Sequence, residues 1–323
     1  MTIVARQLLN ERALGTKASE FATDVVEGLT SIPKRIPAKY FYDQAGSELF
    51  EQITRLPEYY PTRSELWILE EYATQIARHV PPNAAMIEFG AGASTKARVM
   101  LQAAPQIAAY VPVDISGDYL AQEAERLRAD FPQLEVWPVA ADFTRDFALP
   151  DAVRARPKIG FYPGSTIGNF EPREARHFLS HAATLLGSDA RMIVGVDLVK
   201  DPRVLNAAYN DAAQVTAAFN LNLLARINRE LSANFDLQAF RHQAHYNHDL
   251  RRIEMHLVSR RRQTVEVAGV PVSFQAGESI HTENSYKYTV IGFGALARSA
   301  GWETSAVWTD PDGYFSVHML ARA

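Results

Sequence analysis

Residues 86–96 read MIEFGAGASTK, and they give the clearest indication of the fold. An apolar run ends at the acid Glu88, two glycines follow at Gly90 and Gly92, and a helix-compatible segment begins near Lys96. A strand, a tight turn and a helix start in this order are typical of a nucleotide-binding βα unit. Glycines suit such a turn because a Cβ would obstruct the close approach of the backbone to a ligand.

The turn departs from the dinucleotide fingerprint G-x-G-x-x-G, whose third glycine would fall at Thr95. It is similar to the first motif of Rossmann-like S-adenosylmethionine methyltransferases, E/D-x-G-x-G-x-G, with Ser94 in place of the third glycine. The Glu88 carboxylate can receive the cofactor's ammonium group, which NAD lacks, and Lys96 is near enough to meet a carboxylate. This stretch alone favours a methyltransferase and leaves other nucleotide-binding enzymes open.

Composition limits the class of protein. The 323 residues suffice for one large or two smaller domains, and 37 acidic against 33 basic residues give a net charge of −4. This charge argues against nucleic acid or an anionic membrane as the main partner. The chain has no cysteine, which excludes disulfides and thiolate metal sites. Charged residues interrupt the first apolar run and no stretch approaches a membrane span, so we expect a soluble, cytoplasmic protein.

Two further strands are expected to end in acids. Residues 109–116 end near Asp114, which is placed to accept hydrogen bonds from ribose hydroxyls. Residues 134–139 are followed by Asp142 and Phe143, which suit the exocyclic amine and the ring of an adenine. Together with Glu88, three consecutive strand-end acids at βαβ spacing indicate one nucleotide site.

The remaining pattern extends this sheet and adds a second lobe. We expect strands at 158–163 and 192–198, a loop from Gly164 to Asn169 that faces the reactive end of the cofactor, and a helix from Glu171–Pro172. A closing hairpin is expected at 302–308 and 314–320, after a helix at 288–301. The methyltransferase domain would comprise 64–199 and 288–323, and the substrate-binding lobe 10–63 and 200–287.

Elsewhere the expectations are coarser. We expect one helix within residues 1–30, a short helix opened by Ser47, a helix over 64–80 capped by Ser64, and a helical segment over 201–224. Residues 253–259 and 264–274 alternate like the two strands of a hairpin. Tyrosines cluster at 40–42 and 59–60 around the short helix, where they form either core packing or a pocket wall.

Seven long motifs, in order along nearly the whole chain, resemble the histidine Nα-methyltransferases of ergothioneine biosynthesis. They are YFYDQAGSELFEQITRLPEYYPTRSE, EFGAGASTK, YVPVDIS, FYPGSTIGNFEP, YNDAAQVTAAFNLNLL, RRIEMHLVS and HTENSYKY. The resemblance implies an α/β fold, a Rossmann-like class I methyltransferase sheet with a second α+β substrate-binding lobe. It also implies three successive methyl transfers from S-adenosyl-L-methionine to L-histidine, which give hercynine, and a small-molecule enzyme that acts as a monomer.

The resemblance also implies roles for individual residues. The cofactor-binding positions are Glu88, Gly90, Gly92, Lys96, Asp114, Asp142 and Phe143. The catalytic positions around the substrate amino group are Tyr42, Gly164 and Thr166. The substrate-binding positions are Tyr59 on the imidazole side, Asn169 and Tyr209 at the carboxylate, Glu283 and Ser285 at the imidazole, and Met255 packed near it.

Three alternatives are open at this stage. A relative of the same superfamily could act on tryptophan or another amine. A metal site is suggested by His242, His245 and His248, although solvated histidines on a polar face are favoured and no metal is expected. The basic run at 260–262 suggests nucleic-acid binding, although a solvated turn between strands fits the net charge better.

Overall fold

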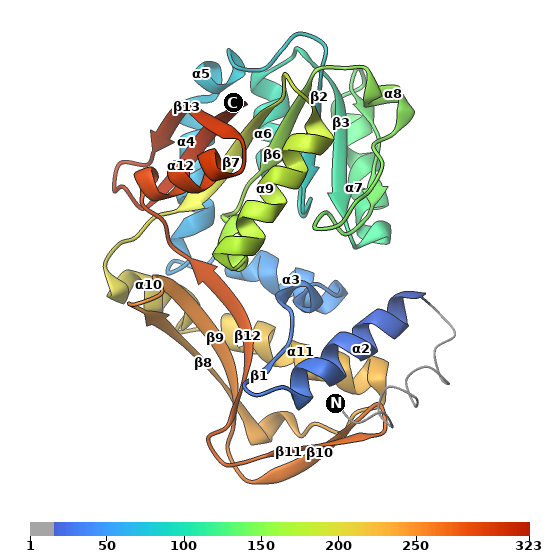
Figure 1. Ribbon diagram of the computed structural model, residues 1–323, viewed down its shortest axis with the longest axis vertical. Helices are drawn as coiled ribbons and strands as arrows, with labels where there is room; N and C mark the ends of the chain where they lie inside the picture. Colours follow the sequence, from blue (N-terminus) through green and yellow to red (C-terminus); the bar gives the residue numbers. More distant parts are fainter. Residues whose placement is uncertain (1–15) are drawn as a thin grey trace. The chain divides into compact units, whose positions relative to one another are not determined.

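The computed structural model describes residues 16–323, and the chain divides into two compact units (Figure 1). Unit 1 contains the described residues up to Tyr59 together with Asp201–Asn284, and unit 2 contains Tyr60–Lys200 and Ser285–Ala323. Among the described residues, none of the helices combines the length and the apolar character that a membrane span requires.

Unit 2 is built on one sheet whose strand order is β13-β14-β7-β6-β2-β3-β4, with the short β5 also paired to β3. Strands β2, β3, β4, β5, β6 and β7 pair in parallel, and β14 runs antiparallel to β7 and β13. Their bounds are β2 Ala84–Phe89, β3 Ile107–Asp114, β4 Glu135–Val136, β5 Val139–Ala140, β6 Lys158–Tyr162, β7 Arg191–Asp197, β13 Trp302–Thr309 and β14 Phe315–Arg322. The order reverses between β2 and β6, which is where open α/β sheets bind ligands. The expected Rossmann-like sheet and closing hairpin are confirmed.

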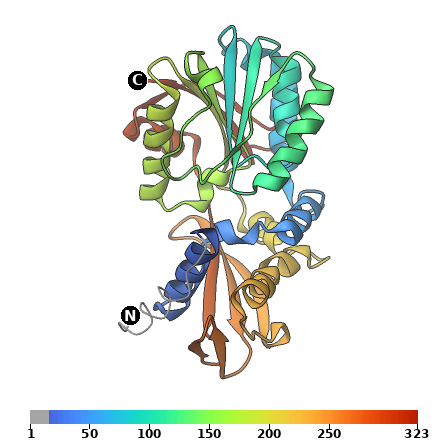
Figure 2. The same cartoon turned by 90° about the vertical axis from the view of Figure 1, so that its right-hand side faces the viewer.

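Helices cover both faces of this sheet, as Figure 2 shows. They are α4 Tyr60–Glu71, α5 Ala73–Ala77, α6 Thr95–Ala103, α7 Gly117–Asp130, α8 Asp151–Arg154, η2 Thr166–Asn169, α9 Pro172–Leu186 and α12 Val290–Ser299. Side chains of β2 alternate between two cores: Ile87 and Phe89 join the core under α9 and α12, and Met86 joins the core under α4, α5, α6 and α7.

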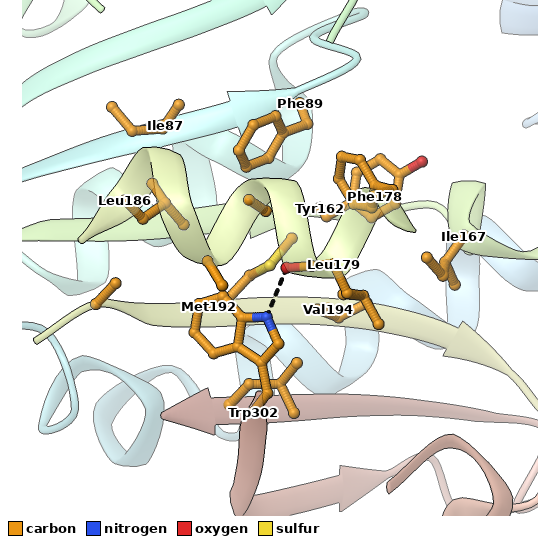
Figure 3. Packing of buried hydrophobic residues seen from close by; sticks show 14 of the residues in the cluster. Ile87, Phe89, Tyr162, Ile167, Phe178, Leu179, Leu186, Met192, Val194 and Trp302 are labelled. Carbon is orange, nitrogen blue, oxygen red and sulfur yellow. Dashed lines mark hydrogen bonds between the residues drawn. The ribbon is translucent and has the colours of Figure 1, made fainter. Parts of the chain in front are cut away.

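Trp302 closes the first of these cores (Figure 3). Its side chain is fully buried, and its indole N–H donates to the carbonyl oxygen of Leu179 at 2.8 Å. The ring thus connects the start of β13 with α9, a helix that packs on this core.

Unit 1 contains a four-stranded sheet in the order β1-β12-β9-β8 and a separate hairpin of β10 and β11. The strands are β1 Lys34–Arg35, β8 Phe240–Asn247, β9 Arg252–Ser259, β10 Gln263–Val267, β11 Val270–Phe274 and β12 Ser279–Tyr286, whose last two residues belong to unit 2. The helices are α2 Thr16–Thr30, η1 Ala38–Phe41, α3 Gln44–Ile53, α10 Pro202–Tyr209, α11 Val215–Leu231 and η3 Leu237–Ala239. Figure 2 shows α11 lying along the strands of the sheet, where it packs on β8 and β9.

Several expectations about helix limits are wrong. The short helix α3 begins at Gln44 rather than Ser47, because Asp43 caps it by accepting the Gly46 N–H at 2.7 Å. Ser64 is not an N-cap, since α4 already begins at Tyr60, and its hydroxyl instead donates to Asp310. The helix expected within residues 1–30 corresponds to α2, Thr16–Thr30, and positions 1–15 lie outside the described part of the chain.

Two expectations about the second lobe also need correction. The segment 201–224 is not one helix: α10 ends at Tyr209, and α11 starts after Gln214, which has a φ of 60°. Residues 264–274 form their own hairpin, β10–β11, while 253–259 pairs with β8, a strand that the sequence pattern did not predict. Polar residues such as His245 and Gln243 alternate with the buried ones there and weaken the apolar signal.

Candidate functional site

The glycine turn follows β2 in unit 2. Glu88 is 4% exposed and its Oε2 accepts the hydroxyl of Tyr110 on the neighbouring strand, while burial raises the pKa of this carboxyl to about 7. Gly90 has a φ of +73°, and a Cβ there would lie 3.3 Å from the ring of Phe143. A Cβ at Gly92 would have no atom within 4 Å, so open space lies beside the turn. Gly90 and Phe143 are therefore brought together beside this turn.

Ser94 shows why the third glycine of the motif is dispensable. The residue precedes the first turn of α6 with a φ of −63°, an ordinary value for a residue with a side chain. Its side chain is 4% exposed. The departure from the motif therefore leaves the conformation of the turn intact.

The second and third strand-end acids lie on neighbouring strands. Asp114 ends β3, its Oδ1 accepts the Ser116 N–H at 2.8 Å, and burial raises the pKa of its carboxyl. Asp142 lies two residues after β5, and its Oδ1 accepts the N–H and the hydroxyl of Thr144 at 3.0 and 2.5 Å. The Ala141 N–H donates to the Asp114 carbonyl at 2.9 Å, which links the two acids through the backbone.

Glu65, which sequence reasoning missed, connects two predicted site residues. Its side chain is 1% exposed; its oxygens accept the Gly164 N–H at 3.0 and 2.8 Å and pair with Lys96 at 2.5 Å. A Cβ at Gly164, whose φ is +81°, would lie 3.4 Å from Thr166 Oγ1 and 3.5 Å from Lys96 Nζ. Lys96, Gly164 and Thr166 are therefore neighbours. An acid with its negative charge among the apolar residues of a helix is the signal that could have identified Glu65.

The loop after β6 is also held from its other side. The Thr166 hydroxyl donates to the Pro163 carbonyl at 2.9 Å, and Ser165 Oγ accepts the Asp197 N–H at 2.9 Å. Asn169 ends the 3-10 turn η2 that this loop enters. The backbone of residues 163–166 is therefore fixed by buried partners at several points.

Asp197 is the centre of a buried charged group in unit 2. Its carboxylate, 1% exposed, accepts the Tyr60 hydroxyl at 2.7 Å and pairs with Lys287 at 2.7 Å and with Lys200. Burial alone would raise the pKa of Asp197, but the two ammonium groups outweigh it and hold the pKa below its ordinary value. Lys287 also donates to Ser285 Oγ at 2.7 Å, so the predicted site residue Ser285 is held by this group.

In unit 1 the predicted tyrosines form a row of rings. Tyr42 lies 5.7 Å from Phe50, Phe50 lies 6.3 Å from Tyr59, and Tyr59 lies 6.3 Å from Tyr209, all in edge-to-face arrangements. Phe219 of α11 supports the start of the row, 5.8 Å from Tyr42. The structure therefore brings together three residues that are distant in sequence, and it adds two phenylalanines that the sequence did not single out.

Met255 and Glu283 lie on the neighbouring strands β9 and β12. Met255 is 1% exposed, and its carbonyl accepts the Thr282 hydroxyl at 3.1 Å. Glu283 follows Thr282 directly and is partly buried. The contact fixes the backbone of β12 beside β9 at the position of the predicted imidazole-binding residue.

The three histidines of the sequence pattern do not form one cluster. His242 bonds Asn220 and the Tyr209 carbonyl, both at 2.9 Å, so it is packed against helices rather than solvated as expected. His248 lies against the ring of Tyr246. The arginine run at 260–262 lies between β9 and β10, where Arg261 pairs with Asp236 at 2.9 Å.

Comparison with known proteins adds relatives of matching length. A family model described as histidine-specific methyltransferase, SAM-dependent, matches residues 21–322. The histidine N-alpha-methyltransferase of Mycolicibacterium smegmatis is 41% identical over 321 residues, which cover 98% of this chain and 99% of that protein.

Two fungal proteins are more distant. The ergothioneine biosynthesis protein 1 of Neurospora crassa is 29% identical over 313 residues, 90% of this chain and 33% of that protein. The 4-dimethylallyltryptophan N-methyltransferase of Aspergillus fumigatus is 30% identical over 342 residues, 99% of this chain and 98% of that protein. From the parallel sheet, the glycine turn and the family match over nearly its whole length, the chain belongs to the SAM-dependent, histidine-specific methyltransferases.

Proposed function

We propose that this protein transfers methyl groups from S-adenosyl-L-methionine to the α-amino group of L-histidine, three times in succession, to give hercynine for ergothioneine biosynthesis. The observation that carries the proposal is the family match over residues 21–322. The relative that acts on a tryptophan derivative makes such an amine the competing substrate.

The residues of unit 2 fit the proposed cofactor. Open space beside Gly92 and the positive φ of Gly90 leave room for a ligand at the turn. We assign Asp114 to the ribose hydroxyls, and Asp142 with Phe143 to the adenine. Glu88 and Lys96 are assigned to the ammonium and carboxylate of the methionine part.

S-adenosylmethionine supplies an electrophilic methyl carbon bonded to a positively charged sulfur. The protein's part is to present a neutral amine whose lone pair points at that carbon, and positioning provides much of the rate. A free α-amino group has a pKa of about 8, so a fraction is already neutral at pH 7 and no strong base is needed. The proton leaves to solvent before each transfer.

Tyr42 and Tyr59 suit an amine that gains methyl groups. Their electron-rich ring faces attract a cation by about 0.5–2 kcal/mol, and this attraction persists when N–H donors are lost. We assign Gly164 and Thr166 to the surroundings of the amine, where Glu65 fixes the Gly164 peptide.

The imidazole and the carboxylate define the choice of amino acid. Lys287 has only donors, so in its 2.7 Å bond Ser285 Oγ is the acceptor. We assign Ser285 as donor to the unprotonated imidazole nitrogen and Glu283 as acceptor from the other, N–H nitrogen. A polar pair of this kind rejects side chains that lack matching groups. Asn169 and Tyr209 are assigned to the substrate carboxylate, and Met255 to packing near the ring.

In the same proposal, unit 2 is the cofactor-binding domain and unit 1 the substrate lobe of a monomeric cytoplasmic enzyme. Light scattering on the purified protein tests the monomer directly. A mass of two chains would refute it.

The proposed function is tested by steady-state kinetics with three separate substrates: histidine, and histidine that carries one or two methyl groups on its α-amino nitrogen. We expect each to be converted, with S-adenosylhomocysteine released in equal amount. Turnover of a tryptophan derivative without turnover of histidine would assign the protein to the competing activity.

A further inference from the structure

A cluster outside the proposed active site joins two strands of unit 1. Strands β8 and β9 run antiparallel, with His245 directly opposite Glu254 and Gln243 opposite His256. Residues opposite one another, and residues two apart on one strand, share a face of the sheet. His245, Glu254 and His256 therefore point to the same side.

The three side chains converge. Each offers a ligand atom, and these atoms all lie within 4.8 Å of one another. Glu254 Oε2 is 3.3 Å from His256 Nε2 and 3.7 Å from His245 Nε2. A tetrahedral ion with bonds of about 2.0–2.2 Å holds neighbouring ligand atoms about 3.3 Å apart, so only small shifts are needed to bind one. The two imidazole rings are nearly parallel, with an interplanar angle of 18°.

The contacts around the cluster orient its members, and an ion would replace the hydrogen bond between His256 Nε2 and Glu254 Oε2. Glu254 Oε1 accepts the Arg252 Nε–H at 2.8 Å and the Asn247 amide at 3.1 Å, so the carboxylate is oriented through its other oxygen. His256 Nδ1 lies 3.3 Å from the hydroxyl of Ser279. Metal-binding histidines and carboxylates are commonly held in this way by groups behind them.

Exposure also suits an ion. The side chains of Glu254 and His256 are 12% and 17% exposed, and that of His245 is 46% exposed, which gives access from solvent.

We propose that His245, Glu254 and His256 form a binding site for a divalent transition-metal ion of the zinc class, with water completing the coordination. Two imidazoles and one carboxylate suit zinc, cobalt, nickel and copper better than magnesium or calcium. The bound ion would tie β8 to β9, the strand that carries Met255. The cation of Arg252 opposes the ion, so we expect exchangeable rather than permanent binding.

The test uses full-length protein without an affinity tag, stripped with a chelator and desalted. Titration with Co²⁺ reports the visible absorption of a nitrogen- and oxygen-bound ion, and Zn²⁺ should displace it. We expect a single ion per chain, loss of the absorption in His245→Ala and His256→Ala, and retention in His248→Ala, a matched control on the same segment. Glu254→Gln keeps the size of the side chain and should weaken binding at least about tenfold.

The results separate this site from the proposed active site. Circular dichroism and S-adenosylhomocysteine binding verify that each variant is folded, whether or not histidine is the substrate. Absence of cobalt absorption in the wild type would overturn the proposal. It would also be overturned if His245→Ala and His256→Ala bind as the wild type does, or if His248→Ala loses binding to the same extent.

Discussion

Replacement of Glu65 by glutamine tests whether this buried acid organises the proposed active site. The substitution keeps the size of the side chain and an oxygen for the Gly164 N–H, but it removes the charge that pairs with Lys96. The glutamine amide has an NH2 group where the carboxylate had a second acceptor oxygen. The Gly164 N–H and the Lys96 ammonium are both donors, so only one of them keeps an acceptor in its present position. Either the Gly164 peptide or the Lys96 ammonium must therefore move.

The expected size follows from burial. Removal of one partner from a buried ion pair costs about 3–5 kcal/mol. Lys96 is 17% exposed, so solvent relieves part of this cost, and we expect a loss of about 3 kcal/mol in the free energy of unfolding. A misplacement of about 1 Å at a reacting centre costs roughly 100-fold in rate, so kcat should fall about 10- to 100-fold.

The assay combines urea unfolding with kcat and KM for both substrates. Glu70→Gln is the matched control, since Glu70 lies on the same helix and is exposed. The double variant Glu65→Gln/Lys96→Met removes both partners of the ion pair. Its loss in the free energy of unfolding should be about 1–3 kcal/mol smaller than the sum of the two single losses, because no unpaired cation is left. Wild-type kcat in Glu65→Gln, or strictly additive losses in stability, would show that Glu65 does not act through Lys96 and Gly164.

Three further predictions concern buried groups. Burial raises the pKa of Glu88 from 4.5 to about 7, so the folded protein holds this proton more tightly than the unfolded chain. The resulting contribution to the free energy of unfolding is complete below pH 4.5 and is lost as the pH rises through 7. Glu88→Gln should therefore flatten this part of the pH profile of unfolding. Lys287→Met should cost about 3 kcal/mol in urea unfolding, by depriving Asp197 of a cation, and raise KM for histidine; unchanged values would contradict this. Trp302→Phe should lower the free energy of unfolding by about 2–4 kcal/mol and leave KM unchanged, because the indole donates to the Leu179 carbonyl in the core. A changed KM would contradict a purely structural role for Trp302.

The methyltransferase sheet could be predicted from the sequence because its signals are local. Strands β2, β3 and β7 contain short apolar runs, and the acids Glu88 and Asp114 mark where β2 and β3 end. The helix from Pro172 was predicted by its proline and acidic cap, and the structure has both. For these elements the local pattern is sufficient, although the capping predictions at Ser47 and Ser64 are wrong.

The second lobe was harder because its strands are only half buried. Strand β8 alternates histidines and other polar residues with buried ones, so it was not recognised as the partner of β9. The break between α10 and α11 depends on Asp211, whose carboxylate accepts the N–H groups of Val215 and Thr216, in a segment with strong helical composition. Tertiary pairing decided both cases.

Among site residues, the partners of the predicted ones could not be derived from the sequence. Glu65 reaches Gly164 across 99 positions, and Lys287 reaches Asp197 across 90. An acid among the apolar residues of a helix can indicate that Glu65 is buried, but a single sequence does not show which distant residues it contacts.

A competition assay by mass spectrometry tests whether histidine is the substrate. Purified protein is incubated with S-adenosylmethionine and an equimolar mixture of the amino acids, and every methylated product is quantified. We expect that histidine alone gains up to three methyl groups, that Glu283→Ala abolishes this gain, and that Glu266→Ala, a change of an exposed acid on β10, retains it. Methylation of tryptophan or another amine in preference to histidine would show that histidine is not the substrate.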